Sequence, residues 1–445
     1  MLTRAIVSDI EERLPDVGRD VLDKAALCVL DALACSFGGR DFAWSVAANA
    51  LIDDVAGPST VWSRGTTHRV LDAIYVNSVH AHSIVQEDMH PASRSHAGTM
   101  VVPAVLALGE SLGSSGRQVL EAVIAGYEAL ARVAAVMTTP DFIARGLRPS
   151  SMFGPFGTAM AAAHLLGLDR EQKVDALGLA GSSASGTTAW AYGGTPDVYF
   201  QNGAAARAGV LAAQLAAQRV AGTAGILEGP SGLLQAFCGV SPGTPVAVGE
   251  TGRWAVSDVY FKAFPSCAFT QEAIEATRRL TGRGLRGEQV AEAVVETYGM
   301  GKRYPGCDNG SSLDTTLERQ MSNQFGVAAM LVDGELGLDR YLGPLHPPIG
   351  ELAKRIFVEE HADLEARYPA TPTVRVRVTT EGGEVLREEV RGGAYLTADG
   401  VIAKFRKYAS PALSGERIDG VISAVGGLAE NGSLTALSRQ LRPVG

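Results

Sequence analysis

The stretch His80–Glu110 reads HAHSIVQEDMHPASRSHAGTMVVPAVLALGE, and it is the most informative part of this chain of 445 residues. Four of the chain's eight histidines lie in it. Its first seventeen residues hold seven titratable side chains, which are His80, His82, Glu87, Asp88, His90, Arg94 and His96. An apolar run with helical spacing follows directly. Acids and bases crowded beside a buried helix are typical of a proton-transfer site, and the alternative is a solvated loop with a few capping residues.

Working outward from this stretch, residues 1–256 show one helical pattern after another. The spacing of apolar residues predicts helices at Val21–Phe37, Val119–Met137, Phe156–Leu166, Glu171–Gly181 and Gly203–Val220. Alanine and glycine at many of these positions let helix axes approach closely. The helices are apolar on more faces than one monomer's core needs, so we expect a large helical domain and a homodimer formed through it.

The pattern changes near Trp254. Alternation at Val290–Tyr298 and Lys354–Val358 indicates strands, and Val259–Ala263 alternates weakly. A hairpin is predicted from Thr373–Thr379 and Val385–Val390, joined by a turn at 381–384. Helices are expected between the strands at Gln271–Leu280 and Gln320–Leu331.

The expected fold is therefore mostly α with an α+β second domain. Residues 1–256 form the first part of a large all-helical domain, and residues 257–404 form a smaller α+β lid domain. Helical spacing resumes after Ala403, so residues 405–445 are expected to return to the helical domain.

Composition excludes several classes of protein. The formal net charge of −9 argues against a nucleic-acid partner, because phosphate binding needs a basic patch. The five cysteines are odd in number and form no CxxC pair, which argues against a disulfide framework and structural zinc. No signal peptide is recognisable at the N-terminus, and no apolar run reaches membrane-spanning length. We expect a cytoplasmic enzyme or binding protein.

No cofactor or metal is expected. The segment Gly282–Gly287 spells GxGxxG but follows a helix rather than a strand, so it fails as a dinucleotide site. The alternative is a metal site formed by His90 and His96 with Glu87 and Asp88. The loop lacks the helical histidine pair of many zinc sites and contains Pro91, which disfavours that reading.

Two further segments carry candidate chemistry. In Gly146–Gly157, a loop enters a helix whose N-terminus could hold a carboxylate, and Arg148 could clamp it. The alternative for Arg148 is a surface arginine beside a helix cap. In KAFPSC, Lys262 could bind an anion or donate a proton, and Cys267 is either a nucleophile or, more simply, a buried packing residue.

Taken in order, several stretches resemble the MmgE/PrpD family, which includes 2-methylcitrate dehydratase, cis-aconitate decarboxylase and iminodisuccinate epimerase. After the histidine-rich loop come GYEAL, FGTAMAAAHLLGLDREQKVDALGLAGSSASG, NGAAARAGVLAAQLA, ILEGPSG, ERQMSNQFGVAAMLVDGE and KFRKYA. The resemblance covers nearly the whole chain. It implies a helical domain with an α+β lid, a site in the cleft between them, and a homodimer.

The resemblance also implies roles for single residues. His96 matches the family's loop histidine, Glu87 and Asp88 its acidic pair, and Lys262 its lid lysine. The chain departs from the family pattern at several positions that are usually polar or differently charged, namely Val85, Met89, Arg148, Cys267, Phe325 and the lysine-free stretch 197–201. These departures point to a different substrate or to lost activity.

We therefore expect a cofactor-independent lyase, similar to a dehydratase or a decarboxylase, that abstracts a proton α to a carboxylate of a small di- or tricarboxylic acid. The expected catalytic residues are His96, Asp88, Glu87 and Lys262, and the expected substrate-binding residues are His90, Arg94, Arg148, Met89 and Cys267. The alternatives are an epimerase or isomerase of a small carboxylic acid, and an inactive binding or partner protein with the same fold.

Overall fold

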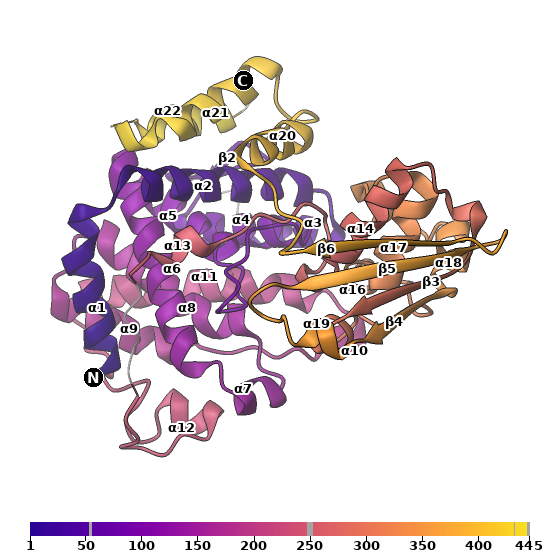
Figure 1. Ribbon diagram of the computed structural model, residues 1–445. Coiled ribbons are helices and arrows are strands. Elements are labelled where there is room, and N and C mark those ends of the chain that lie inside the picture. Colours follow the sequence, from indigo (N-terminus) through magenta and orange to yellow (C-terminus); the bar gives the residue numbers. More distant parts are fainter. Residues whose placement is uncertain (53–55, 247–251, 431, 443–445) are drawn as a thin grey trace.

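The computed structural model describes residues 1–52, 56–246, 252–430 and 432–442. Two parts lie side by side, a larger helical part and a smaller part built on a sheet (Figure 1). The helices of the larger part, in chain order, are α1 (Leu2–Arg13), α2 (Arg19–Gly39), α3 (Ala43–Ala50), α4 (Val70–His82), α5 (Gly98–Leu112), α6 (Gly116–Met137), α7 (Pro140–Ala144), α8 (Pro149–Leu165), α9 (Arg170–Gly181), α10 (Trp190–Gly193), α11 (Asp197–Ala217), α12 (Leu233–Cys238) and α13 (Ala255–Asp258). Two short strands, β1 (Ser59–Val61) and β2 (Thr66–His68), pair beside them.

Local sequence accounts for where these helices begin and end. Ser115 caps α6 by accepting from the backbone N–H of Gln118, whose side chain reaches back to Ser115 N–H. Gly113 ends α5 in the left-handed conformation, which glycine adopts without steric cost. The predicted helices over 21–37, 119–137, 156–166, 171–181 and 203–220 are all present, with boundaries shifted by a few residues.

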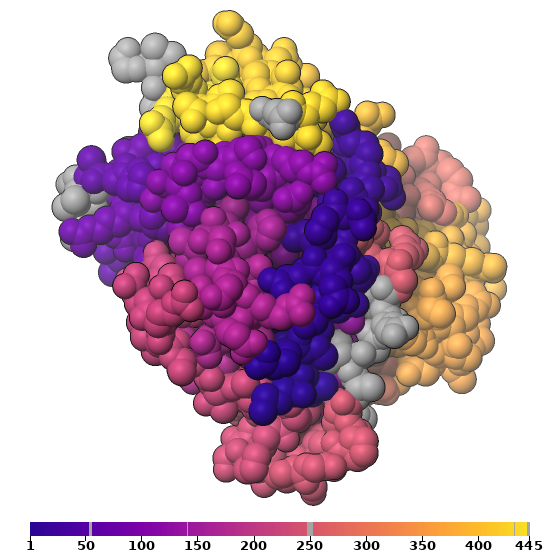
Figure 2. All heavy atoms as spheres, turned by 90° about the vertical axis from the view of Figure 1, so that its left-hand side faces the viewer, coloured from indigo at the N-terminus to yellow at the C-terminus, as the bar shows by residue number. Residues whose placement is uncertain are grey.

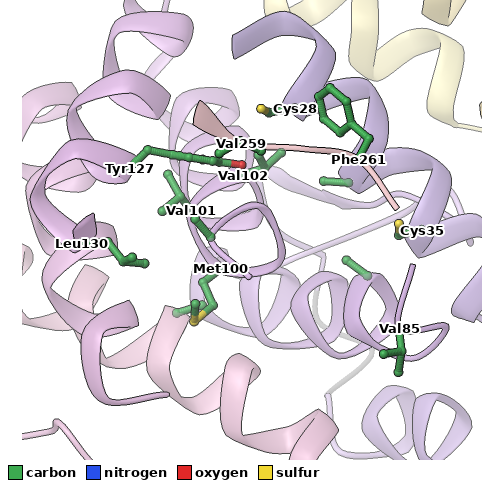
Figure 3. Packing of buried hydrophobic residues seen from close by; sticks show 14 of the residues in the cluster. Cys28, Cys35, Val85, Met100, Val101, Val102, Tyr127, Leu130, Val259 and Phe261 are labelled. Carbon is green, nitrogen blue, oxygen red and sulfur yellow. The ribbon is translucent and has the colours of Figure 1, made fainter. Parts of the chain in front are cut away.

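Close helix packing forms the core of the helical part. Helices α6 and α8 cross where Gly126 faces Gly157, and a Cβ on either glycine would lie less than 3 Å from the carbonyl oxygen of the other. The side chains of Val101, from α5, and Leu130, from α6, pack at this crossing (Figure 3). All five cysteines are buried and free, and Cys28 and Cys35 belong to this core.

The second part holds a four-stranded sheet in the order β4-β3-β5-β6. Its elements are α14 (Gln271–Gly282), β3 (Val290–Thr297), α15 (Gly299–Arg303), α16 (Thr316–Met321), α17 (Asn323–Asp333), α18 (Pro347–Ala353), β4 (Ile356–Glu360), α19 (Ala362–Glu365), β5 (Thr373–Thr380) and β6 (Val385–Arg391). Strands β3 and β4 are parallel, and the other pairs are antiparallel. The predicted hairpin is confirmed as β5 and β6, with alternate valines of β5 buried.

Two expectations for this part were wrong in detail. The helix expected at Gln320–Leu331 is divided at Ser322, which has extended backbone angles and caps α17 by accepting from Phe325 N–H. Residues 259–263 form no strand, and only Tyr260 and Lys262 make isolated bridges, to Met89 and Tyr395 respectively. This segment therefore connects the histidine-rich loop to the sheet part.

The C-terminal helices α20 (Ala398–Ala409), α21 (Gly415–Gly426) and α22 (Leu434–Leu441) pack on α2 and α5 of the helical part. In the side view these helices cover the upper end of the helical part, and α1 lies on the side that faces the viewer (Figure 2). The expected mostly α fold with an α+β second domain is confirmed, whereas the boundaries at 256 and 404 stay predictions. Among the described helices, none has the length and apolar character needed to cross a membrane.

Candidate active site

The histidine-rich loop joins α4 to α5 and is fixed from both sides. His82 is the last residue of α4, and residues 83–97 form the loop. Met89 exchanges two backbone hydrogen bonds with Tyr260, at 2.9 and 3.0 Å, which ties the loop to the segment that leads into the sheet part. Val85 and Arg94 both have φ values above +50°, a conformation that is unfavourable for a β-branched or bulky side chain and marks a constrained loop.

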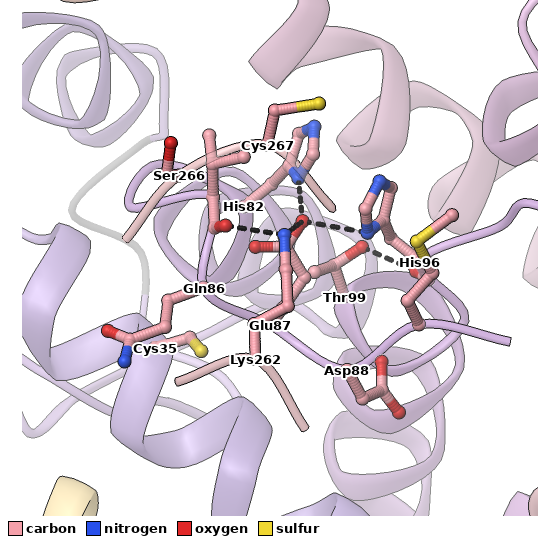
Figure 4. A network of polar contacts seen from close by, with 12 residues as sticks. Cys35, His82, Gln86, Glu87, Asp88, His96, Thr99, Lys262, Ser266 and Cys267 are labelled. Carbon is pink, nitrogen blue, oxygen red and sulfur yellow. Dashed lines mark hydrogen bonds and ion pairs between the residues drawn. The ribbon is translucent and has the colours of Figure 1, made fainter. Parts of the chain in front are cut away.

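Glu87 is the electrostatic centre of the loop. Its Oε1 atom lies 2.8 Å from His82 Nδ1, 3.0 Å from His96 Nδ1 and 3.7 Å from Lys262 Nζ. The His82 contact is a hydrogen bond, whereas the His96 contact is close but poorly aligned for one. Each imidazole turns one nitrogen toward Glu87 and the other away from it (Figure 4). One buried carboxylate thus orients two rings.

The partners of His82 define its tautomer. Its Nε2 lies 2.8 Å from Nη2 of Arg148, and a guanidinium can only donate, so Nε2 accepts. The ring proton must then be on Nδ1, where it is donated to Glu87. Arg148 also donates to the side-chain oxygen of Asn202, whose amide nitrogen donates to Thr99 Oγ1 at 2.7 Å. Thr99 in turn donates to the backbone carbonyl of His96, which closes the network.

Burial and neighbouring charges set the protonation states. Burial alone raises the pKa of Glu87, but the Lys262 ammonium and the two imidazoles outweigh it and hold that pKa well below its usual range. Burial lowers the pKa of His96 far below its ordinary value, although Glu87 opposes this effect. Burial also lowers the pKa of Arg148, to about 10. At neutral pH the site therefore holds an ionised Glu87, a neutral His96 and a cationic Arg148.

Arg148 is the cation of this network with no acidic partner among its hydrogen bonds to described residues. Those partners are His82 and Asn202, and neither carries a negative charge. Its side chain is nevertheless buried, since the residue is 4% exposed. The Glu87 carboxylate acts on Arg148 only across the His82 ring, so this buried cation has no direct ionic partner, and an anionic ligand would stabilise it.

Lys262 contacts the loop outside the cavity wall described below. It is fully buried, and its Nζ donates to the backbone carbonyl of Val85. That carbonyl is turned toward Lys262 by the left-handed conformation of Val85. Lys262 therefore fixes the loop and balances the charge of Glu87.

A cavity of about 280 Å³ opens beside this network, between the helical part and the sheet part. Several of the described side chains that line it belong to the polar network or its surroundings, namely His82, Val85, Met89, Arg94, His96, Arg148, Cys267 and Tyr304. This volume is just below the range of about 300–1,000 Å³ that is usual for ligand sites.

The structure divides the nine predicted site residues into three groups. Those lining the cavity are His96, Arg94, Arg148, Met89 and Cys267. Glu87 and Lys262 lie directly behind them and contact the rings or the loop rather than the cavity. Asp88 and His90 are not among the described residues that line the cavity.

Asp88 and His90 make contacts other than those expected of residues in the site. Asp88 turns away from Glu87, as Figure 4 shows, and its carboxylate accepts from Gly98 N–H and from the Tyr127 hydroxyl. The ring nitrogen Nδ1 of His90 contacts the Ser93 hydroxyl and accepts from Ser93 N–H. Successive loop residues point in different directions, so Asp88 anchors the start of α5 and His90 holds the turn 90–95.

Sequence reasoning did not assign His82 and Asn202 to the site. His82 belongs to the same histidine cluster, and its position five residues before Glu87 was the available signal. Nothing in the sequence marked Asn202, which lies within the alanine-rich helix α11. His80, by contrast, lies outside the network and contacts Asn49 and Ser63.

A metal has no evident place in this network. Both rings turn Nδ1 toward one carboxylate oxygen, and Arg148 occupies the other nitrogen of His82. Within residues 1–52, 56–246, 252–430 and 432–442, no three His, Cys, Asp or Glu side chains are grouped as metal ligands. The absence of a metal and of any other cofactor stays a prediction.

Comparison with known proteins identifies the family. Residues 10–244 match the MmgE/PrpD N-terminal domain, and residues 264–425 match the MmgE/PrpD C-terminal domain. The chain belongs to the MmgE/PrpD family, as the order of its motifs indicated.

The relatives of this chain include cis-aconitate decarboxylases. It is 25% identical over 399 residues to a cis-aconitate decarboxylase of Aspergillus terreus, covering 84% of this chain and 81% of that protein. It is 26% identical over 441 residues to the cis-aconitate decarboxylase of Mus musculus, covering 95% and 89%. A cis-aconitate decarboxylase-like protein of Aspergillus oryzae is 27% identical over 350 residues, covering 73% and 72%. This kinship supports an enzyme of the lyase class.

Proposed function

We propose that this enzyme is a cofactor-independent lyase that transfers a proton at the carbon α to a carboxylate of a small carboxylic acid. The observation that carries the proposal is that Arg148, buried without a direct ionic partner, and His96, held beside the Glu87 carboxylate, line one cavity. An anion binder alone would need the arginine. Only proton transfer needs the adjacent imidazole, held by its own carboxylate.

Arg148 supplies the binding site for a substrate carboxylate. Its guanidinium lines the cavity at the N-terminus of α8, where it is the residue before Pro149. The positive end of the helix dipole adds to the attraction for an anion. A carboxylate bound here becomes the direct ionic partner that Arg148 otherwise lacks, and Arg94 offers a second cation on the same wall.

His96 supplies the proton-transfer group. A proton on Nδ1 faces the negative oxygen of Glu87, which leaves Nε2 as the basic nitrogen of a neutral ring. When Nε2 takes a proton from the substrate, the imidazolium that forms is stabilised by Glu87, and the charge that develops on the substrate is stabilised by Arg148. A dehydratase then expels a β-hydroxyl group. A decarboxylase uses the same group in the other direction. His96 then first takes a proton from solvent at Nε2, with Glu87 stabilising the imidazolium, and donates it to the carbanion after carbon dioxide leaves.

Glu87 and Lys262 act through other groups in this scheme. Glu87 orients both rings and favours the imidazolium, and Lys262 keeps Glu87 ionised. We therefore assign both as positioning residues, and His96 as the catalytic residue.

The test is a screen of di- and tricarboxylic acids, including cis-aconitate, in deuterated buffer by proton NMR. Deuterium should appear at a carbon α to a carboxylate, with loss of water or carbon dioxide for the true substrate class. His96→Gln should abolish both signals while the melting temperature stays unchanged. Turnover that survives in His96→Gln would refute the assignment of proton transfer to His96.

The same screen separates the alternatives. An epimerase would exchange the α proton and change the stereocentre without losing a group, and it would need a second proton-transfer residue. Cys267 is the candidate, since it lines the cavity and its Sγ lies 3.9 Å from Cys307 Sγ, a contact that lowers the pKa of Cys267. An inactive binding protein would show neither exchange nor loss of a group with any acid that binds.

A homodimer and a cytoplasmic location complete the proposal. Support for the dimer comes from apolar residues exposed on α11 and just after it, namely Leu211, Leu215 and Val220, which are 40–45% exposed. Light scattering at micromolar concentration should give twice the mass of 46.5 kDa. A mass of one chain would contradict the dimer without affecting the catalytic proposal.

A further inference from the structure

The cavity is charged at its base and open at its mouth, as the exposure of its lining residues shows. His82 and Arg148, at the base, are 2% and 4% exposed. Tyr192 is 82% exposed and the side chain of Arg303 is 64% exposed, and Ala144 is exposed as well, so these three residues mark the mouth. A substrate carboxylate on Arg148 would therefore leave the rest of the substrate directed toward the mouth.

The wall between base and mouth is mainly apolar. It comes from both parts of the molecule and includes Ile143, Leu147, Val198, Phe269, Met300 and Leu317. Phe269 stacks at a tilt on Tyr304, with 4.9 Å between ring centroids, which extends this wall toward α15. A methylene group lying here is removed from water, whereas a carboxylate would lose its hydration without gaining a partner.

The cations near the cavity are too few for a tricarboxylate. Among the described lining residues the cations are Arg94, Arg148 and Arg303. Arg303 is already paired with Glu360, and Lys262, behind the wall, is paired with Glu87. Two carboxylates can find unpaired arginine partners among the described lining residues, whereas a third would have none.

We propose that the substrate is a mono- or dicarboxylic acid with an apolar substituent of several carbons, which lies along this wall while the reacting carboxylate contacts Arg148. This inference rests on the proposed function for the choice of the reacting end. It names the substrate class of that same site.

Calorimetric titration with a series of ligands tests the inference on the whole protein. The probes are succinate, methylsuccinate, butylsuccinate, hexylsuccinate and the tricarboxylate tricarballylate. Each buried methylene should lower Kd about fourfold, the equivalent of about 0.8 kcal/mol. Butylsuccinate should therefore bind at least tenfold more tightly than either succinate or tricarballylate.

A variant at the mouth provides the matched control. Ala144→Phe narrows the mouth at an exposed position, so it should weaken hexylsuccinate at least tenfold and leave succinate within twofold. Ala412→Phe makes the same change in the exposed turn between α20 and α21, away from the cavity, and should leave both affinities unchanged.

Equal affinities along the series, tighter binding of tricarballylate, or no binding of any probe would each overturn the inference. Loss of chain-length dependence in Ala412→Phe as well as in Ala144→Phe would do so too. The titration needs no turnover, so a protein that prefers alkylsuccinates but exchanges no α proton would refute the proposed function alone.

Discussion

Replacing Glu87 by glutamine tests whether its carboxylate is the electrostatic centre of the site. Glutamine keeps the shape of the side chain but removes the charge that lies 2.8–3.7 Å from His82, His96 and Lys262. The Lys262 ammonium would stay fully buried without its counter-charge. Removing one partner of a buried ion pair costs about 3–5 kcal/mol.

The expected change in melting temperature follows from the size of the chain. At about 2.1 cal/mol/K for each residue, 445 residues give an unfolding entropy of about 0.9 kcal/mol/K. Glu87→Gln should therefore lower the melting temperature by about 3–5 °C at pH 7. The folded-state pKa of Glu87 is depressed, so its contribution is complete above the ordinary value of 4.5 and is lost as the pH falls below it. The difference between the two proteins should shrink in acid.

The double variant Glu87→Gln/Lys262→Met supplies the control. It removes the Lys262 ammonium together with the Glu87 carboxylate, so no unpaired charge stays buried. The double variant should therefore melt at a higher temperature than Glu87→Gln alone. Scanning calorimetry of the four proteins of this cycle, at pH 7 and at pH 4, measures the coupling. A shift of less than about 1 °C for Glu87→Gln, or a further loss in the double variant, would refute the electrostatic account.

Three further outcomes are expected. His96→Gln should reduce α-proton exchange by about 10²- to 10⁴-fold, whereas His90→Gln, which changes a ring outside the cavity wall, should retain most of the activity. Arg148→Ala should raise KM more than it lowers kcat, and steady-state kinetics showing the reverse would contradict a carboxylate clamp. Burial raises the pKa of Glu272 to about 7 in the folded protein. Between pH 4.5 and 7 this carboxyl group is ionised in the unfolded chain but stays protonated in the folded one, so the folded state loses stability as the pH rises through this interval. Glu272→Gln should then be more stable than the parent by about 3 kcal/mol at pH 8 and equal to it at pH 4, as denaturant titrations at both values would show.

The sequence determined the local structure well. Periodicity alone located the long helices of the larger part and the hairpin of β5 and β6, because the side chains of one helix face or one strand face must share an environment. It also located the loop that carries the candidate site, because the titratable residues are concentrated there. It did not show the break at Ser322, where a hydroxyl that caps a new helix outweighed continuous helical spacing.

Which loop side chains face the cavity was decided by the tertiary structure. Adjacent residues Glu87 and Asp88 read alike in the sequence, yet one orients two imidazoles and the other anchors α5. The partners that hold the two carboxylates and the loop come from elsewhere in the chain: Lys262, which bonds the Val85 carbonyl, lies 177 positions further along. The spacing of apolar residues along the sequence does not predict such a long-range contact. A loop without a repeating backbone takes its side-chain directions from whatever distant groups bond to it, and only the folded chain brings those groups within reach.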